Sequence, residues 1–147
     1  MTVQALRPRG CAACGRTIYE RGIARIIEAA RADNGADLVE EYLTKKPWLL
    51  RRKKTQVNEA DMAIVFEEYA RTGTLRIPQE LNDLDLSIGL REIKVGPARF
   101  PFYEPADPRH VVTVTRLTHG FTKGTVQTPR KEIDKAKHVM EQDRNQP

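Results

Sequence analysis

Cysteine is scarce in this sequence, and long apolar runs are missing from it. Two cysteines among 147 residues exclude a disulfide framework of the kind that holds small secreted domains together. A reducing cytoplasm is therefore the expected compartment. No stretch approaches the roughly 20 consecutive apolar residues that a membrane-spanning helix needs. The basic first ten residues are not followed by an apolar run, so we do not expect a secretory signal.

Charged residues, in contrast, make up 31% of the chain, and lysine and arginine outnumber aspartate and glutamate by 25 to 20. A net charge of +5 and a pI of about 9.4 are common among proteins that bind nucleic acid, although charge alone does not demonstrate binding.

The length suits one domain. We expect residues 1–20 to form a flexible N-terminal extension, since they show no clear periodicity, and residues 21–147 to form the domain.

The first half of the chain predicts two amphipathic helices. Asp37 is placed to cap a helix over residues 38–43, in which the apolar residues follow helical spacing. Asn58 is placed to cap a second helix, whose apolar residues share one face and which ends at Gly73. Together they predict a helical hairpin. Residues 23–32 (IARIIEAARA) precede it and fit either a helix by propensity or a strand by alternation.

The second half predicts strands followed by a helix. Residues 88–95, 99–103 and 110–117 are rich in β-branched or aromatic residues and are separated by turns, which predicts an antiparallel meander with the last strand in a central position. Pro101 favours an edge or a bulge for its own strand. Thr128 and Pro129 have the composition of a helix start, with Thr128 as the cap. These elements predict an α+β fold.

Cys11 and Cys14 form a CxxC pair followed by glycine, in a turn-like knuckle. A zinc ribbon needs a second such pair or two suitably spaced histidines. The three histidines lie far from the pair in sequence and form no HxxxH motif. Two chains could share an intermolecular metal site, the pair could be redox active, or the pair could be incidental. Both cysteines are therefore weak metal candidates, and we expect no cofactor.

The run of residues 117–129, LTHGFTKGTVQTP, resembles the signature of the RelE/ParE toxin superfamily, in particular its phage-derived HigB-like branch. In that branch a Leu-Leu-His-Gly-Phe-x-Lys-Lys-Thr-x-Lys-Thr-Pro-like run ends the last strand, and Glu-Ile and a helical Ala follow it. Glu132, Ile133 and Ala136 occupy those places here. Residues 89–94 (GLREIK) and 99–103 (RFPFY) resemble the two preceding strands of the family. The resemblance covers roughly residues 23–141.

The resemblance implies a RelE-like α+β fold. In such a fold an N-terminal strand and a helical hairpin pack on a small, mostly antiparallel, curved sheet, and a helix ends the chain. This arrangement favours the strand for residues 23–32.

The resemblance also implies the toxin of a type II toxin–antitoxin pair, a cytoplasmic, metal-independent, ribosome-dependent mRNA endoribonuclease that inhibits translation. Its partners would be a cognate antitoxin protein, the ribosome and mRNA, with no membrane involved. Cleavage of RNA through its 2′-hydroxyl requires a base, an acid and cations. The catalytic candidates are His119, Lys123, Arg99 and Lys94. The candidates for contact with nucleic acid are Arg116, Tyr103, Arg51, Arg52, Lys53 and Lys54.

Three positions depart from the family pattern. Lys94 stands where arginine is usual, and Gly124 and Gln127 stand where lysines are usual. The missing lysines favour an alternative, a non-enzymatic protein on the same fold that binds a host protein, as the ParE branch binds DNA gyrase, or a degenerate interaction module. A third interpretation is a basic nucleic-acid-binding domain that shares only the fold. The candidate side chains also fit structural roles, such as the solvent-facing side of a half-buried sheet.

Overall fold

The computed structural model describes residues 9–45, 59–123 and 128–147, and over these residues the chain has an α+β fold. The strands are β1 (Arg9–Gly10), β2 (Thr17–Arg21), β3 (Arg25–Ala29), β4 (Leu81–Asp85), β5 (Leu90–Val95), β6 (Ala98–Tyr103), β7 (Thr113–Leu117) and β8 (Phe121–Thr122). The helices are α1 (Leu38–Lys45), α2 (Glu59–Thr72) and α3 (Arg130–Arg144), and a short 3-10 turn covers Leu86–Ile88. None of the described helices is long and apolar enough to cross a membrane.

The strands form one mixed sheet in the order β1-β2-β3-β7-β6-β5-β4, and β8 pairs with β6 beside this path. β3 and β7 run parallel, and the other described pairs are antiparallel. The predicted meander is therefore confirmed as β5-β6-β7. The strand alternative for residues 23–32 is confirmed as β3, which lies next to β7 although Ile27 and its partner Thr115 are 88 positions apart in the sequence.

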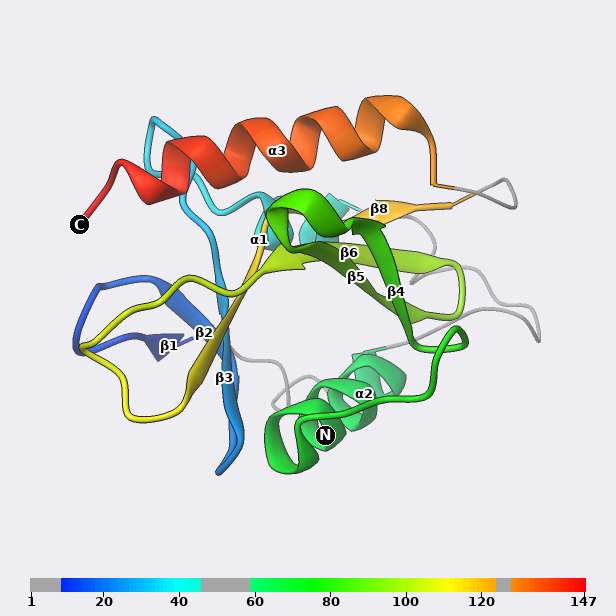
Figure 1. The fold of residues 1–147 in the computed structure, drawn as a ribbon, viewed down its shortest axis with the longest axis horizontal. Coiled ribbons are helices and arrows are strands. Elements are labelled where there is room, and N and C mark those ends of the chain that lie inside the picture. The colour runs from blue at the N-terminus through cyan, green and yellow to red at the C-terminus, as the bar shows by residue number, and fades with distance from the viewer. Residues whose placement is uncertain (1–8, 46–58, 124–127) are drawn as a thin grey trace.

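Helices cover both faces of the sheet (Figure 1). α2 packs on one face, where Phe66 and Tyr69 meet Phe100 and Phe102 of β6 in edge-on and tilted ring contacts. α1 adds Val39 to the same apolar core. α3 runs across the opposite face, so side chains that point away from the α2 core are also largely buried.

Local sequence chemistry explains where the helices begin and end. The Asp37 carboxylate accepts hydrogen bonds from the backbone N–H groups of Val39 and Glu40, both at 3.0 Å, so the predicted cap of α1 is confirmed. Gly73 ends α2 with a φ of 80°, a conformation that glycine adopts without strain. The predicted Thr128 cap is wrong, because the Thr128 hydroxyl instead donates to the buried Glu92 carboxylate at 3.0 Å. The predicted cap Asn58 lies outside the described residues.

Residues 9–20 differ from the expected flexible extension. They form β1, the Cys11–Gly15 knuckle and most of β2, and they include buried side chains such as those of Arg16, Ile18 and Tyr19. β2 pairs with β3 and carries α2 on one face. The domain therefore extends at least from residue 9 in the described part of the chain.

Candidate functional site

Three of the four predicted catalytic residues meet at the β5–β6 hairpin. Lys94 and Arg99 are direct partners across the two strands, so their side chains leave the same face of the sheet. Lys123 follows β8, and its backbone N–H donates to the Pro97 carbonyl at 2.8 Å, which fixes it beside the hairpin turn. We refer to Lys94, Arg99 and Lys123 as the cation cluster.

The electrostatics of these residues reflect their proximity. The pKa of Lys123 is lowered by partial burial and by the positive charges of Arg99 and Lys94, with Glu92 acting in the opposite direction. Burial also lowers the pKa of Arg99. The Arg99 side chain donates to the carbonyls of Gly96 and Ala98, whereas its buried Nε has no hydrogen-bond partner within the described part of the chain. Three cations beside one buried carboxylate, that of Glu92, favour the binding of an anion at the cluster.

A surface groove of about 410 Å³ adjoins the cluster. Lys94 and Lys123 line it together with Asn82 and Asp83 of β4 and the start of the α3 segment. Its volume falls in the range of about 300–1,000 Å³ typical of ligand sites. The groove could therefore hold a nucleotide unit with its phosphate against the two lysines.

His119 is not available to a substrate in this structure. Its ring is fully buried and stacks on the Phe121 ring with centroids 5.6 Å apart. Nε2 lies 2.9 Å from a Glu132 carboxylate oxygen, and Nδ1 lies 3.0 Å from the Thr118 hydroxyl. Burial lowers the pKa of His119, and the hydrogen bond from the ring lowers the pKa of Glu132. The structure thus contradicts a direct acid or base role for His119. Through Glu132, His119 instead connects the end of β7 to α3.

Arg116 and Tyr103, predicted to contact nucleic acid, are buried in an ionic network under α3. Arg116 donates to Glu28 at 2.6 Å, to Asp107 at 2.9 Å and to Asp143 at 3.2 Å. The Tyr103 hydroxyl donates to Asp143. With exposed fractions of 4% and 1%, neither side chain can reach a phosphate or stack on a base. The sequence alone predicted that both side chains face solvent, because nothing near them in sequence would bury them. The acidic residues that bury them are distant in sequence.

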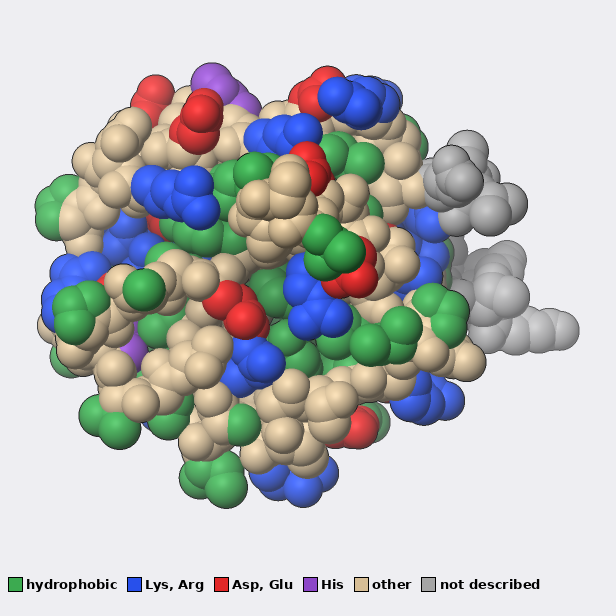
Figure 2. All heavy atoms as spheres, viewed as in Figure 1, with side chains coloured by type: hydrophobic (Ala, Val, Ile, Leu, Met, Phe, Trp, Pro, Cys, Tyr) green, Lys and Arg blue, Asp and Glu red, His purple; other side chains and the backbone are tan. Residues whose placement is uncertain are grey.

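The predicted basic run of Arg51, Arg52, Lys53 and Lys54 lies outside the described residues. Figure 2 shows lysine and arginine side chains spread over the viewed face with acidic side chains between them. Net charge therefore does not mark an RNA surface on that face, and the cation cluster is identified by its geometry.

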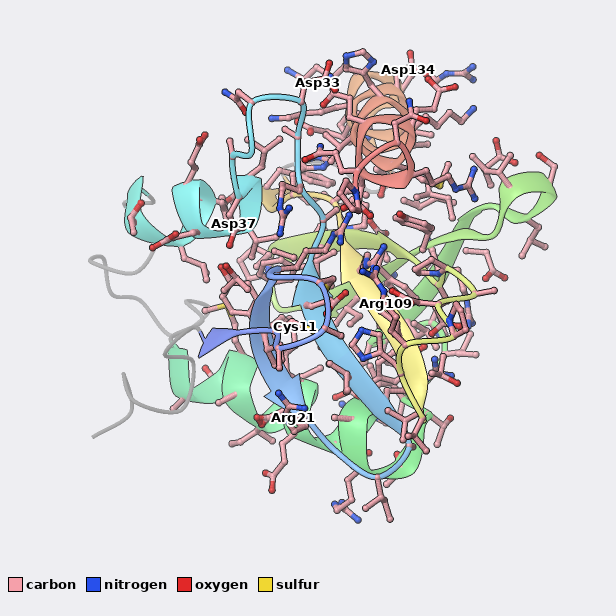
Figure 3. The ribbon with its side chains drawn as sticks, turned by 90° about the vertical axis from the view of Figure 1, so that its left-hand side faces the viewer. Cys11, Arg21, Asp33, Asp37, Arg109 and Asp134 are labelled. Carbon is pink, nitrogen blue, oxygen red and sulfur yellow. The ribbon has the colours of Figure 1, made fainter. Side chains whose placement is uncertain are left out.

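Cys11 and Cys14 lie in the knuckle between β1 and β2, where Glu28 and His110 join them. Figure 3 shows Cys11 and Arg109, the neighbour of His110, on the same side of the molecule. Sequence analysis missed Glu28 and His110, because His110 follows Cys11 by 99 residues and no spacing rule links them.

Comparison of the chain with protein-family models and with curated protein sequences found no match.

Proposed function

We propose that this protein is a RelE/ParE-like toxin of the HigB-like kind that cuts mRNA on the ribosome at the cation cluster. The observation that carries the proposal is the meeting of Lys94, Arg99 and Lys123 beside one groove. The order of elements supports it as well. The strand β3, the helices α1 and α2, the meander β5-β6-β7 and the helix α3 follow one another in the order that the resemblance implies, and β1, β2, β4 and β8 are additional to it.

The residues of the cluster supply what cleavage through a 2′-hydroxyl needs. In this mechanism Lys123 takes the 2′-hydroxyl proton in its deprotonated form, and the direction of its pKa shift, which comes from partial burial and the neighbouring positive charges, makes it the better base of the two lysines. The 2′-oxygen then forms a bond to phosphorus while the bond from phosphorus to the 5′-oxygen breaks. Lys94 as an ammonium group donates a proton to the departing 5′-oxygen, and Arg99 stabilises the charge that develops on the phosphoryl oxygens. The products are a 2′,3′-cyclic phosphate and a 5′-hydroxyl end.

The proposal extends to the control of the activity. A cytoplasmic toxin of this kind needs a partner that closes its active site until the partner is degraded. An antitoxin segment with a carboxylate in the groove would pair with Lys94 and Lys123 and exclude a phosphate. We therefore place the antitoxin contact over the groove and the adjoining start of α3.

The proposal is tested by incubating the wild-type protein with purified ribosomes that carry a defined mRNA. We expect primer-extension stops within the translated region only when ribosomes are present. The 3′ ends should be 2′,3′-cyclic phosphates, and a single 2′-deoxy substitution at a mapped cut should abolish that cut. Products with 5′-phosphate ends would contradict the mechanism, and normal translation with intact mRNA would contradict the function.

A pair of charge-removing substitutions provides the matched control. Arg99→Met removes a cluster cation, and Arg71→Met removes an exposed cation from α2, which packs on the opposite face of the sheet. We expect cleavage to fall by about 100-fold or more with Arg99→Met, the usual effect of losing one group that stabilises the transition state. Arg71→Met should leave cleavage unchanged, and an equal loss in both variants would contradict the proposed site.

The second candidate function is a non-enzymatic interaction protein on the same fold. The burial of His119 favours it, together with Gly124 and Gln127 in place of the family lysines. On this account the cation cluster binds an acidic surface of a host protein. Translation would then proceed with intact mRNA, and Arg99→Met would weaken capture of that protein instead of RNA cleavage.

A further inference from the structure

Four side chains with metal-binding atoms converge at the β1–β2 knuckle, apart from the cation cluster. They are Cys11 and Cys14 of the knuckle, Glu28 of β3 and His110 of the loop before β7, and we call them the Cys–His cluster. One ligand atom from each residue lies within 4.8 Å of every other. Two cysteines, a histidine and a carboxylate are all side chains that bind zinc in proteins.

The separations suit a tetrahedral ion. Zinc–sulfur and zinc–nitrogen bonds of about 2.3 and 2.0 Å place the ligand atoms of a tetrahedron roughly 3.3–3.8 Å apart. The Cys11 Sγ lies 3.8 Å from His110 Nε2, and the Cys14 Sγ lies 3.8 and 3.7 Å from the two Glu28 oxygens. Small side-chain rotations therefore bring the four atoms onto one ion.

The backbone of the knuckle is held in position by hydrogen bonds. The Gly15 N–H donates to the Cys11 carbonyl at 2.8 Å, and the Cys11 N–H donates to the Arg16 carbonyl at 2.7 Å. Gly15 has a φ of 78°, so the tight turn after the second cysteine needs a glycine. Arg31 donates to the Cys14 carbonyl at 2.9 Å. Both thiols are thus directed to the same side before a ligand arrives.

Glu28 is also oriented. Its Oε2 accepts a 2.6 Å hydrogen bond from Arg116, which leaves Oε1 for a metal ion. Carboxylates that ligate a metal commonly accept such a hydrogen bond from a neighbouring group. The carboxylate is fully buried, and the His110 side chain is only 5% exposed, so the cluster is a closed site.

We propose that the Cys–His cluster binds one zinc ion through the two thiolates, the His110 imidazole and Glu28 Oε1. Two cysteines and one histidine are typical zinc ligands, and a carboxylate is an accepted fourth. The two thiols release their protons to solvent on binding, and the two thiolate charges balance the charge of the ion, so the net charge of the neighbouring buried network does not change. The ion would tie the knuckle to β3 and to the loop before β7, which makes its role structural.

The first test measures metal content. The full-length protein is purified under reducing conditions, its zinc is quantified by mass spectrometry, and X-ray absorption defines the ligands. We expect one zinc per chain with two sulfur and two nitrogen or oxygen neighbours. Replacement of zinc by cobalt should give a thiolate-to-cobalt charge-transfer band and the intense visible bands of a tetrahedral ion.

Two histidine variants form a matched pair. His110→Ala removes a proposed ligand, whereas His138→Ala removes an exposed histidine of α3. We expect His110→Ala to weaken cobalt binding by more than the 10–100-fold that results from losing a group hydrogen-bonded to a metal ligand. His138→Ala should bind as the wild type does. Because Cys11→Ser could unfold the knuckle, the absorption spectrum of the wild-type protein provides an independent readout.

Three results would overturn the inference. The first is wild-type protein that takes up no zinc or cobalt when reduced. The second is a bound metal with only nitrogen and oxygen neighbours. The third is a Cys11–Cys14 disulfide that persists in protein purified with reductant, which would identify the pair as a redox couple.

Discussion

Asp143 of α3 is the centre of the ionic network that attaches this helix to the sheet. Its carboxylate accepts hydrogen bonds from Arg16 at 2.6 Å, from Arg116 at 3.2 Å, from the Arg31 backbone N–H at 2.7 Å and from the Tyr103 hydroxyl. The Asp143 side chain has no exposed surface. We therefore expect Asp143→Asn to destabilise the protein strongly, because it leaves two buried guanidinium groups short of a counter-charge.

The size of the effect follows from what remains in the variant. Removing one partner of a buried ion pair costs about 3–5 kcal/mol. Arg116 keeps Glu28 and Asp107, and Arg16 keeps hydrogen bonds to the carbonyls of Gln146 and Pro147, so the lower end applies. A loss of about 3 kcal/mol in the free energy of unfolding corresponds to a Tm lower by roughly 6–12 °C in a domain of this size.

Thermal and urea unfolding followed by circular dichroism measure this difference. The control is Asp134→Asn, which breaks an exposed pair with Arg130 on the same helix. We expect the control to change the free energy of unfolding by no more than about 0.5 kcal/mol. If Asp143→Asn also changed it by less than about 1 kcal/mol, the network would not be the attachment of α3 described above.

Three further results are expected. Gly120→Ala should destabilise the protein by about 1–3 kcal/mol in urea unfolding, because its Cβ would lie 2.5 Å from a ring carbon of Tyr42, whereas Gly10→Ala meets no atom within 4 Å and should be tolerated. Since the folded pKa of His119 lies below the unfolded value of about 6.5, the unfolded state binds more protons in acid. The free energy of unfolding should therefore fall from about pH 7 to pH 5, and His119→Gln should flatten that part of the profile. In RNA-binding titrations at several salt concentrations, Arg99→Met should reduce the slope of log K against log salt by about 0.7, the share of one phosphate contact to single-stranded RNA.

The helices and strands that show a clear residue pattern in the sequence were predicted correctly. α2 and α3 each show an apolar stripe at helical spacing, and β5, β6 and β7 are short runs of β-branched or aromatic residues between turns, so the sequence alone located them. β2 escaped prediction because Ile18 and Tyr19 are adjacent and both buried, at a register shift in its pairing with β3, so no alternation is visible. β4 escaped because asparagine and aspartate are rare in strands, and Leu81 is its one fully buried side chain.

Pro101 illustrates a prediction that context overturned. Proline favours an edge strand because it cannot donate to a ladder. β6 is nevertheless flanked by β5 and β7, and Pro101 uses its carbonyl instead, which accepts the Thr118 N–H at 2.8 Å. The missing donor is thus accommodated where the partner strand ends.

Among the candidate site residues, too, some neighbours could be predicted from the sequence and others could not. The proximity of Lys94, Arg99 and Lys123 follows from strand pairing, because Lys94 and Arg99 face each other across the β5–β6 hairpin and β8, which precedes Lys123, pairs with β6. The burial of His119 and Arg116 depends on Glu132, Asp143 and Glu28, which no local pattern connects to them. The Cys–His cluster also escaped prediction, since its ligands come from three separate segments that only the fold brings together.

The most direct test of the central claim compares Lys123→Met with His119→Gln in single-turnover cleavage of mRNA on ribosomes. Both variants are first shown to be folded by circular dichroism at the assay pH. If the cation cluster is the active site, Lys123→Met lowers the cleavage rate by about 100-fold or more, whereas His119→Gln stays within a few-fold of the wild type. The opposite order, with cleavage lost in a folded His119→Gln and retained in Lys123→Met, would contradict the account.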